Sequence, residues 1–322
     1  AFRFGNPIVD DWEGRVNAWP LDEGLIDYTS GDYGNEENAL ATLNVIATPK
    51  FTLSGNEIDA STITPELISG TLHEADGIEA NVASGYHAIE FLLWGQDLNG
   101  TNPGAGARPF TDYATGDACT GGNCDRRAAY LQAATDLLVS DLTEMVGNWE
   151  AEGPARTAVT TDPQKGILAI LTGMGSLSYG ELAGERMKLG LMLNDPEEEH
   201  DCFSDNTYNS HYYDGLGIRN VYLGTYTRTD GSTLTGPALA DLVAAADPAV
   251  DTQLKAELDA SVAALQALKD AGDGGKAYDT LLAAGNAEGE ALIMGAVNAL
   301  VTQTASVDRA VTALGLSKIE FE

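Results

Sequence analysis

A histidine and a glutamate three residues apart are the side chains of this sequence best suited to chemistry. His87 and Glu90 lie in a largely apolar run that begins at Gly85. If that run is helical, the two side chains share one face, because positions i and i+3 are neighbours on a helix surface. An imidazole beside a carboxylate suits a transition metal, and two ionisable groups among apolar residues need partners if they are buried. The pair predicts half of a metal site or, alternatively, a hydrogen-bonded structural pair at a domain junction.

A second polar segment, residues 199–211, holds two of the four histidines together with carboxylates, hydroxyls and a thiol. One interpretation is a network of turns and caps, because Ser, Asp, Asn and Thr are common in loops. The other is a polar loop that completes the site begun by His87. His211 is expected to be a packing or hydrogen-bonding residue, and His73, among polar neighbours, a solvated surface residue.

The two leading ligands are too few for a catalytic zinc site, which normally has three protein ligands and an open position. The sequence has no His-Glu-x-x-His motif, and the inverted form fails because Phe91 follows Glu90. The candidates for further ligands are Asp22, Glu23, Asp97, Glu181, Glu185, His200, Asp201 and Asp205. An oxygen-rich set with one imidazole suits iron or calcium as readily as zinc. The predicted cofactor is therefore a divalent or trivalent metal ion, with iron, zinc and calcium all left open.

The charge of the chain limits its partners. The 322 residues include 17 Lys and Arg against 49 Asp and Glu, which gives a formal net charge of -32. Such a field repels nucleic acids and attracts cations, so nucleic-acid binding is not expected. The acidity is also compatible with simple solubility in a salty medium.

The cysteines and the first residues bear on location. Cys119 and Cys124 flank a short glycine-containing loop in which a local disulfide can form, and an oxidising compartment favours one. Cys202 is then left over, either buried or as a free thiol. Ala1-Phe2-Arg3-Phe4 lacks the features of a signal peptide, and no apolar run reaches the roughly 18 residues of a membrane span. We expect a periplasmic or cell-surface protein, whose membrane anchor, if it has one, preceded Ala1.

The pattern of apolar residues predicts an all-α protein made of two helical-bundle domains with long polar loops. The predicted helices cover residues 36–48, 64–68, 78–95, 126–150, 163–193, 237–246, 250–270 and 275–313. Residues 1–36, 99–125 and 194–235 read as loops. The predicted domains are 1–155, which carries His87 and Glu90, and 156–322.

Several motifs together resemble the imelysin-like proteins. Gly85-Tyr86-His87-Ala88-Ile89-Glu90 matches the GxHxxE motif of that family. The segments that also resemble it are Trp19 to Glu23, Leu93 to Asp97, Cys124 to Arg127 with Tyr130-Leu131, His200 to Thr207, and Gly217 to Gly224. The similarity covers nearly the whole chain. Family members usually have a helical segment before the region that matches Ala1.

The resemblance implies two related helical-bundle domains with a site near their junction. It also implies an extracytoplasmic bacterial protein linked to iron acquisition, whose partners are a metal or iron-bearing ligand and membrane components of iron uptake. The metal ligands expected besides His87 and Glu90 are Glu23, Asp205, His200 and Glu185. Residues expected to contact the ligand are Asp22, Asp97, Arg127, Ser204 and Asn206. Two alternatives stay open: a metallopeptidase, the activity for which the family was named, and a structural or partner-docking module.

Overall fold

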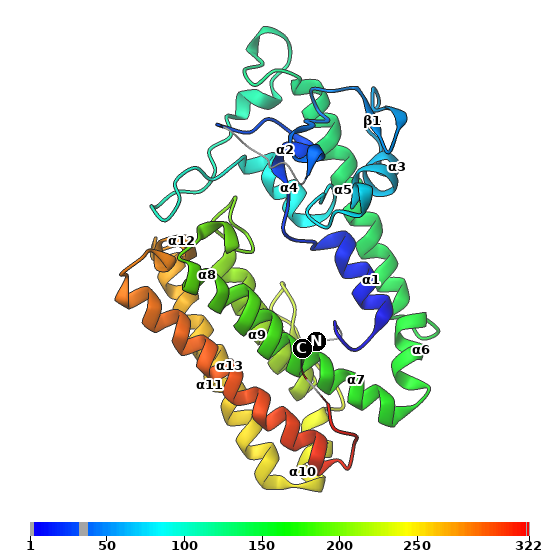
Figure 1. The fold of residues 1–322 in the computed structure, drawn as a ribbon. Coiled ribbons are helices and arrows are strands. Elements are labelled where there is room, and N and C mark those ends of the chain that lie inside the picture. The colour runs from blue at the N-terminus through cyan, green and yellow to red at the C-terminus, as the bar shows by residue number, and fades with distance from the viewer. Residues whose placement is uncertain (1–2, 32–37, 320, 322) are drawn as a thin grey trace. The chain divides into compact units, whose positions relative to one another are not determined.

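The computed structural model describes residues 3–31, 38–319 and 321 (Figure 1). Helices hold 62% of the described residues and strands 4%, which confirms the all-α class. The chain forms two compact units. Unit 1 comprises Ala1–Asp10, Asn99–Gly104 and Trp149–Glu322, and unit 2 comprises Asp11–Leu98 and Ala105–Asn148. The division into domains 1–155 and 156–322 stays a prediction.

Unit 2 is organised around the long helix α5 (Cys124–Asn148), against which α4 (Gly85–Trp94) packs. Its shorter helical elements are α2 (Glu23–Ile26), η1 (Ala39–Thr42), α3 (Pro65–Leu67), η2 (Ile68–Leu72), η3 (Ala75–Gly77), η4 (Phe110–Tyr113) and η5 (Gly116–Ala118). The strands β1 (Lys50–Leu53) and β2 (Asn56–Asp59) form an antiparallel hairpin. The guanidinium of Arg126 donates to four backbone carbonyls, those of Val45, Ile46, Ala60 and Ser61. One side chain of α5 thereby holds the loops on either side of the hairpin.

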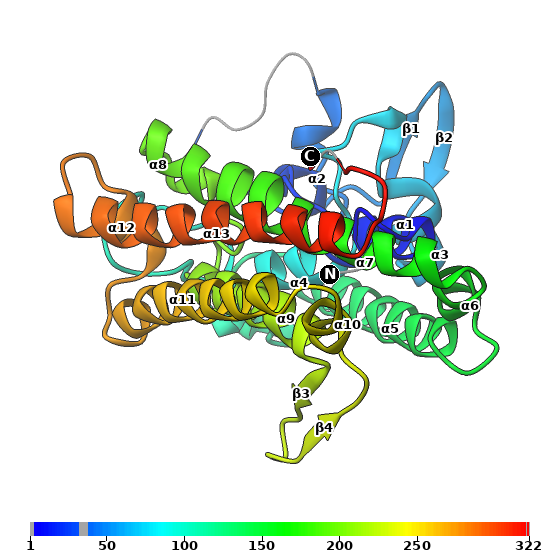
Figure 2. The same ribbon diagram turned by 90° about the horizontal axis from the view of Figure 1, so that it is seen from below.

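Unit 1 is a helical bundle. Helix α11 (Pro248–Asp273) packs against α9 (Thr207–Leu223) and α13 (Ala287–Ala313), and α13 also packs against η6 (Leu177–Lys188). Figure 2 shows α11 and α13 running side by side. The remaining helical elements are α6 (Pro154–Thr160), α7 (Pro163–Ser176), α8 (Leu189–Leu193), η7 (Pro196–Glu198), α10 (Leu239–Ala246) and α12 (Tyr278–Leu282). The strands β3 (Thr225–Thr227) and β4 (Thr233–Thr235) form a hairpin that projects from the bundle.

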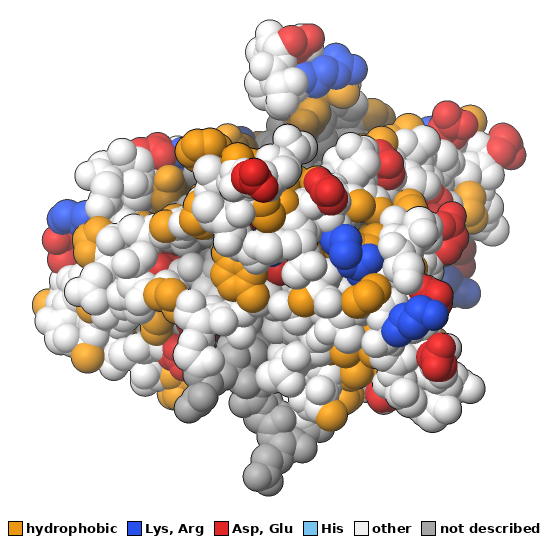
Figure 3. Space-filling model, turned by 90° about the horizontal axis from the view of Figure 1, so that it is seen from above, with side chains coloured by type: hydrophobic (Ala, Val, Ile, Leu, Met, Phe, Trp, Pro, Cys, Tyr) orange, Lys and Arg blue, Asp and Glu red, His pale blue; other side chains and the backbone are white. Residues whose placement is uncertain are grey.

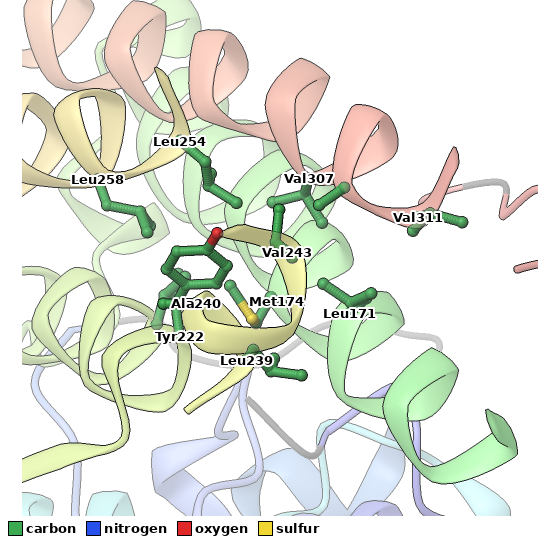
Figure 4. Packing of buried hydrophobic residues seen from close by; sticks show 12 residues of the cluster. Leu171, Met174, Tyr222, Leu239, Ala240, Val243, Leu254, Leu258, Val307 and Val311 are labelled. Carbon is green, nitrogen blue, oxygen red and sulfur yellow. The ribbon is translucent and has the colours of Figure 1, made fainter. Parts of the chain in front are cut away.

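The core of unit 1 follows from helix periodicity. In α11 the buried residues Leu254, Leu258, Ser261, Leu265 and Leu268 recur every three or four positions, which places them on one stripe. Figure 4 shows apolar side chains from α7, α9, α10, α11 and α13 directed at one another in one cluster. A second cluster gathers buried residues of η6, α11, α12 and α13. The predicted helix at 250–270 is confirmed for this reason.

Helix start signals were informative where proline followed a capping residue. Thr64 Oγ1 accepts a hydrogen bond from the Leu67 amide at 3.2 Å, and Pro65 occupies the first turn of the helix predicted over 64–68. Asp162 caps α7 in the same way by accepting from the amides of Gln164 and Lys165. These signals are local, so the helices that carry them were predicted correctly.

Two predicted loops were wrong in part. Residues 1–36 contain the helix α1 (Pro7–Val16). Asn6 precedes its first residue, and Asn6 Oδ1 accepts a hydrogen bond from the Ile8 amide at 3.1 Å. Residues 194–235 contain α9. Its apolar residues do not gather on one face, because polar or small residues such as Thr207, His211 and Gly215 occupy buried positions, so the sequence lacks the usual helical pattern. The predicted helix at 36–48 lies partly outside the described residues, which show only η1 there.

Three other expectations can be compared with the structure. Cys119 and Cys124 form the predicted disulfide, and Cys202 is buried. Among the helices of the described residues, none combines the length and the apolarity needed to cross a membrane. On the face drawn in Figure 3, the Lys and Arg side chains lie scattered between acidic and apolar ones.

Candidate functional site

His87 and Glu90 lie together on α4 in unit 2. The Nδ1 atom of His87 is 3.2 Å from Oε2 of Glu90, and the two residues are 1% and 8% exposed. Both are therefore almost completely removed from water on a helix whose other buried members are apolar or small. An imidazole beside a carboxylate provides one nitrogen and one or two oxygen donors. That donor set fits a borderline cation such as Zn²⁺ or Fe²⁺.

The glycine of the motif has a specific structural role. Gly85 begins α4 with φ +83°, a conformation that L side chains rarely adopt. A Cβ atom at this position would also lie 2.4 Å from the carbonyl oxygen of Val16. Ser84 Oγ donates to the Arg15 carbonyl at 3.0 Å beside this contact. The start of the His87 helix is thus pressed against the end of α1, and only glycine fits there.

Gly85→Ala should therefore destabilise unit 2, by about 1–3 kcal/mol for the backbone strain alone. Urea unfolding followed by tryptophan fluorescence measures this loss, because Trp12, Trp19 and Trp94 all belong to unit 2. Gly14→Ala is the matched control, since a Cβ there would meet nothing within 4 Å. A Gly85→Ala midpoint equal to that of the wild type would contradict this account of the motif.

Aromatic and acidic residues from the segment before α2 surround the pair. The Trp19 ring packs edge-on against the His87 ring, with 5.1 Å between centroids. Helix α2 packs against α4 and carries Glu23, which is only 6% exposed. Glu23 Oε2 accepts a hydrogen bond from Gln96 Nε2 at 2.5 Å, just beyond the end of α4. Of the further ligands predicted from the sequence, Glu23 therefore lies in unit 2, on a helix that packs against α4.

The other candidates in unit 2 have different surroundings. Arg127, predicted to contact ligand, is 1% exposed and donates to both carboxylate oxygens of Asp27, at 2.6 and 3.0 Å. Burial opposes its charge, but the hydrogen bond and the charge of Asp27 outweigh this and raise the pKa of Arg127. Asp22 and Asp97 are half-buried, and Asp22 accepts a hydrogen bond from Asn38. Arg127 therefore serves to hold the core of unit 2 together.

The segment predicted to complete the site lies in unit 1. Glu199 and His200 are buried, Asp201, Ser204 and Asp205 are half-buried, and Asn206 is exposed. The Asp201 amide donates to Thr207 Oγ1 at 2.9 Å, which anchors the segment to the first turn of α9. Carboxylate oxygens of Asp205 and of Asp279, a residue that the sequence did not single out, lie within 4.8 Å of each other. Glu185 is exposed on η6.

A small cavity adjoins this segment. Its volume is about 290 Å³, and its lining residues are Pro103, Gly104, Ser204, Asp205, Tyr208, Gly272, Gly275 and Ala277. The predicted residues Ser204 and Asp205 are thus brought to one pocket within unit 1. Gly272 is required there, because a Cβ would lie 2.3 Å from the Tyr208 ring. The glycine-rich turn after α11 could not have been linked to Ser204 from the sequence.

Of the two remaining histidines, His73 differs from expectation and His211 agrees with it. His73 was predicted to be solvated, but it is half-buried, and its Nε2 lies 3.0 Å from the Gly14 carbonyl oxygen. Burial lowers the pKa of His73, although Glu74 and the Gly14 carbonyl act in the opposite direction. His211 is a packing residue as predicted: it is fully buried and meets the Tyr278 ring edge-on at 4.9 Å.

Comparison with known proteins agrees with this architecture. The family model described as Imelysin matches residues 1–307. A crystal structure described as that of an iron-regulated protein A precursor from Parabacteroides distasonis superposes with a TM-score of 0.63. The two sequences are 16% identical, and the match covers 97% of this chain and 77% of that chain, so the likeness establishes the fold alone. Among curated proteins, none matches this chain.

Proposed function

This chain belongs to the imelysin family, and we propose that it binds a metal ion or a metal-bearing ligand outside the cytoplasm, in the service of iron acquisition. The observation that carries the proposal is the buried pair His87 and Glu90, 3.2 Å apart on α4. Burying two ionisable groups is costly unless they are paired or bind a metal. If the pair served packing alone, apolar side chains of similar volume could take its place at little cost in stability. The presence of two buried ionisable groups therefore supports a ligand-binding role.

Other observations support the setting of the proposal. The Cys119–Cys124 disulfide favours an oxidising compartment. The net charge of -32 attracts cations to the protein surface. The protein of similar fold from Parabacteroides distasonis is described as an iron-regulated protein A precursor, which suggests the link to iron.

The geometry favours binding over peptide hydrolysis. A zinc peptidase of the His-Glu-x-x-His type places two imidazoles and a general base on one helix, whereas α4 carries one imidazole and one carboxylate. The metal would be held by His87 and Glu90, and Glu23 lies buried on α2, the helix that packs against α4. Chelator-sensitive cleavage of an unstructured peptide by the purified protein would favour the peptidase alternative instead.

The test is titration of the metal-free protein with Fe²⁺ under anaerobic conditions and, separately, with Zn²⁺. Loss of even a hydrogen-bond partner of a metal ligand costs roughly 10–100-fold in affinity. His87→Ala and Glu90→Ala should each weaken the affected site at least as much. His73→Ala and Glu74→Ala are matched controls from the same unit and should bind metal as the wild type does.

Two outcomes contradict the assignment. Unchanged binding in both His87→Ala and Glu90→Ala would remove these residues from any metal site. If the same variants also had lowered thermal stability, the pair would be a structural brace, as in the docking-module alternative.

A further inference from the structure

We propose that His73 is a pH-sensitive latch, which holds the start of α4 against the end of α1 and opens when its ring is protonated. The latch belongs to unit 2 and does not depend on the metal-binding role proposed for His87 and Glu90. His73 directly follows η2, and its ring contacts Gly14 of α1 and Ala83, which lies two positions before α4. One imidazole thus joins three segments of the unit.

The two ring nitrogens of His73 have different partners, and these partners determine where its proton lies. Nε2 is 3.0 Å from the carbonyl oxygen of Gly14, which can only accept a hydrogen bond, so Nε2 carries a hydrogen. Nδ1 is 3.3 Å from the backbone nitrogen of Ala83, which donates a hydrogen bond to it. A ring nitrogen that accepts a hydrogen bond has no proton of its own. The two contacts together therefore require the neutral imidazole with its proton on Nε2.

Protonation of His73 is incompatible with the contact to Ala83. The added proton would lie on Nδ1 and point at the Ala83 N–H group, so two donors would face each other and the hydrogen bond would be lost. Ser84 Oγ, 3.3 Å from Nδ1, could accept from the charged ring, because it donates its own hydrogen to the Arg15 carbonyl at 3.0 Å. Ala83 is fully buried, so its amide would then lack an acceptor away from water, which is costly. Acid therefore opens the latch at Ala83.

The groups that face His73 do not cancel the effect of its burial. Glu74, the carbonyl of Gly14 and, from α5, Asp141 all favour the charged ring. The carboxylate of Asp141 is itself paired with Arg15, whose Nη1 lies 2.8 Å from it. Burial has the largest effect and lowers the pKa of His73 from its ordinary value of 6.5. Below that value the unfolded chain binds more protons than the folded one, so the latch loses stability as the pH falls.

The turn between the two halves of the latch is held by bonds that do not titrate. Glu74 and Asp76 have φ values of +53° and +57°, a conformation that L side chains rarely adopt. Asn81 is fully buried and supports this turn: its carbonyl accepts from the Glu74 amide, and its side chain donates to the Ala75 carbonyl, both at 2.8 Å. These amide bonds are independent of pH, so the response to acid should begin at the ring of His73.

The test is hydrogen exchange of the Ala83 amide in the full chain, measured by NMR at pH values on either side of 6.5 and corrected for intrinsic exchange rates. One hydrogen bond changes an equilibrium by a factor of roughly 2–10, so protection of this amide should fall by about that factor in acid. His73→Asn supplies a neutral oxygen in place of Nδ1 and should abolish the response to acid, whereas His73→Ala should lower protection at every pH. Such an increase in a rare opening leaves nearly every chain closed, so His73→Ala still serves as a control for metal titration.

Two further signals of the wild type decide the question even if a variant does not fold. The Val45 amide, which donates to the Leu25 carbonyl at 3.0 Å in the same unit, should keep its protection. An equal loss at Val45 and Ala83 would mean that acid unfolds the whole unit, and it would overturn the latch. Nitrogen-15 NMR of the four labelled histidines should show the His73 proton on Nε2 at neutral pH. A proton on Nδ1 there, or Ala83 protection that stays constant while His73 titrates, would overturn it as well.

Discussion

Asp27→Ala should destabilise unit 2 by about 3–5 kcal/mol, the usual cost of removing one partner from a buried ion pair. Asp27 lies between two guanidinium groups. Arg127 Nε donates to it at 2.6 Å and Arg108 Nη1 at 2.7 Å, and all three side chains are 1% exposed. Without this carboxylate, the ion pair that remains to Arg108 within the described residues is the one with Asp112, whose Oδ2 is 3.5 Å from Arg108 Nη1. The network joins segments far apart in the sequence, so its loss should loosen the whole unit.

Urea unfolding followed by tryptophan fluorescence tests this prediction, since it reports mainly on unit 2. Asp27→Asn should fall between the wild type and Asp27→Ala, because it keeps the shape and loses the charge. Asp59→Ala removes the partner of Lys50 in a surface pair of the same unit and should change little, since exposed pairs are screened by water. If the Asp27 and Asp59 variants unfolded at the same urea concentration, the buried network would not be the main support of unit 2.

His211→Gln should remove much of the acid sensitivity of unit 1. The folded chain keeps His211 neutral down to a pKa of about 3, because burial disfavours the charged ring. The unfolded chain takes up this proton near the ordinary value of 6.5. Between these values the unfolded state binds more protons, so stability is lost as the pH falls from 6.5 to about 3. One pKa unit is about 1.4 kcal/mol, so this loss is on the order of 5 kcal/mol in the wild type.

The measurement is hydrogen exchange of peptides from α9 and α13 in the presence of a chelator, at several pH values and with correction for intrinsic exchange rates. Asp214, whose pKa is raised to about 7 mainly by burial, has the opposite effect, because its contribution is lost as the pH rises. Comparison of His211→Gln with the wild type cancels that contribution. His73→Gln, in unit 2, is the control and should leave the acid response of α9 unchanged. Parallel pH profiles for His211→Gln and the wild type would contradict the prediction.

The part of the candidate site that could be predicted is the part encoded within one helix. The apolar run after Gly85 and the spacing of His87 and Glu90 predicted a helix with both groups on one face, and they lie 3.2 Å apart on α4. The Cys119–Cys124 disulfide was equally accessible, because its loop is short. The predicted helix was too long at its start, since Gly85 itself begins the helix at positive φ.

The residues that sequence reasoning missed depend on contacts between distant segments. Arg127 was expected to meet ligand, but its partner Asp27 lies 100 positions away in the sequence. The cavity beside Ser204 involves the turn after α11, and Asp279 approaches Asp205 from α12.

By itself, the sequence determined the all-α class, the helix starts at Pro65 and Pro163, the disulfide and the His87–Glu90 pair. These features rest on capping, helical periodicity and short loops, which act over a few residues. Only the tertiary structure decided which ionisable groups are buried and which residues contact them. Arg127 is paired with Asp27, and the His211 ring packs against Tyr278. The physical reason is desolvation, because the properties of an ionisable group depend on how much water and which charges the folded chain leaves around it.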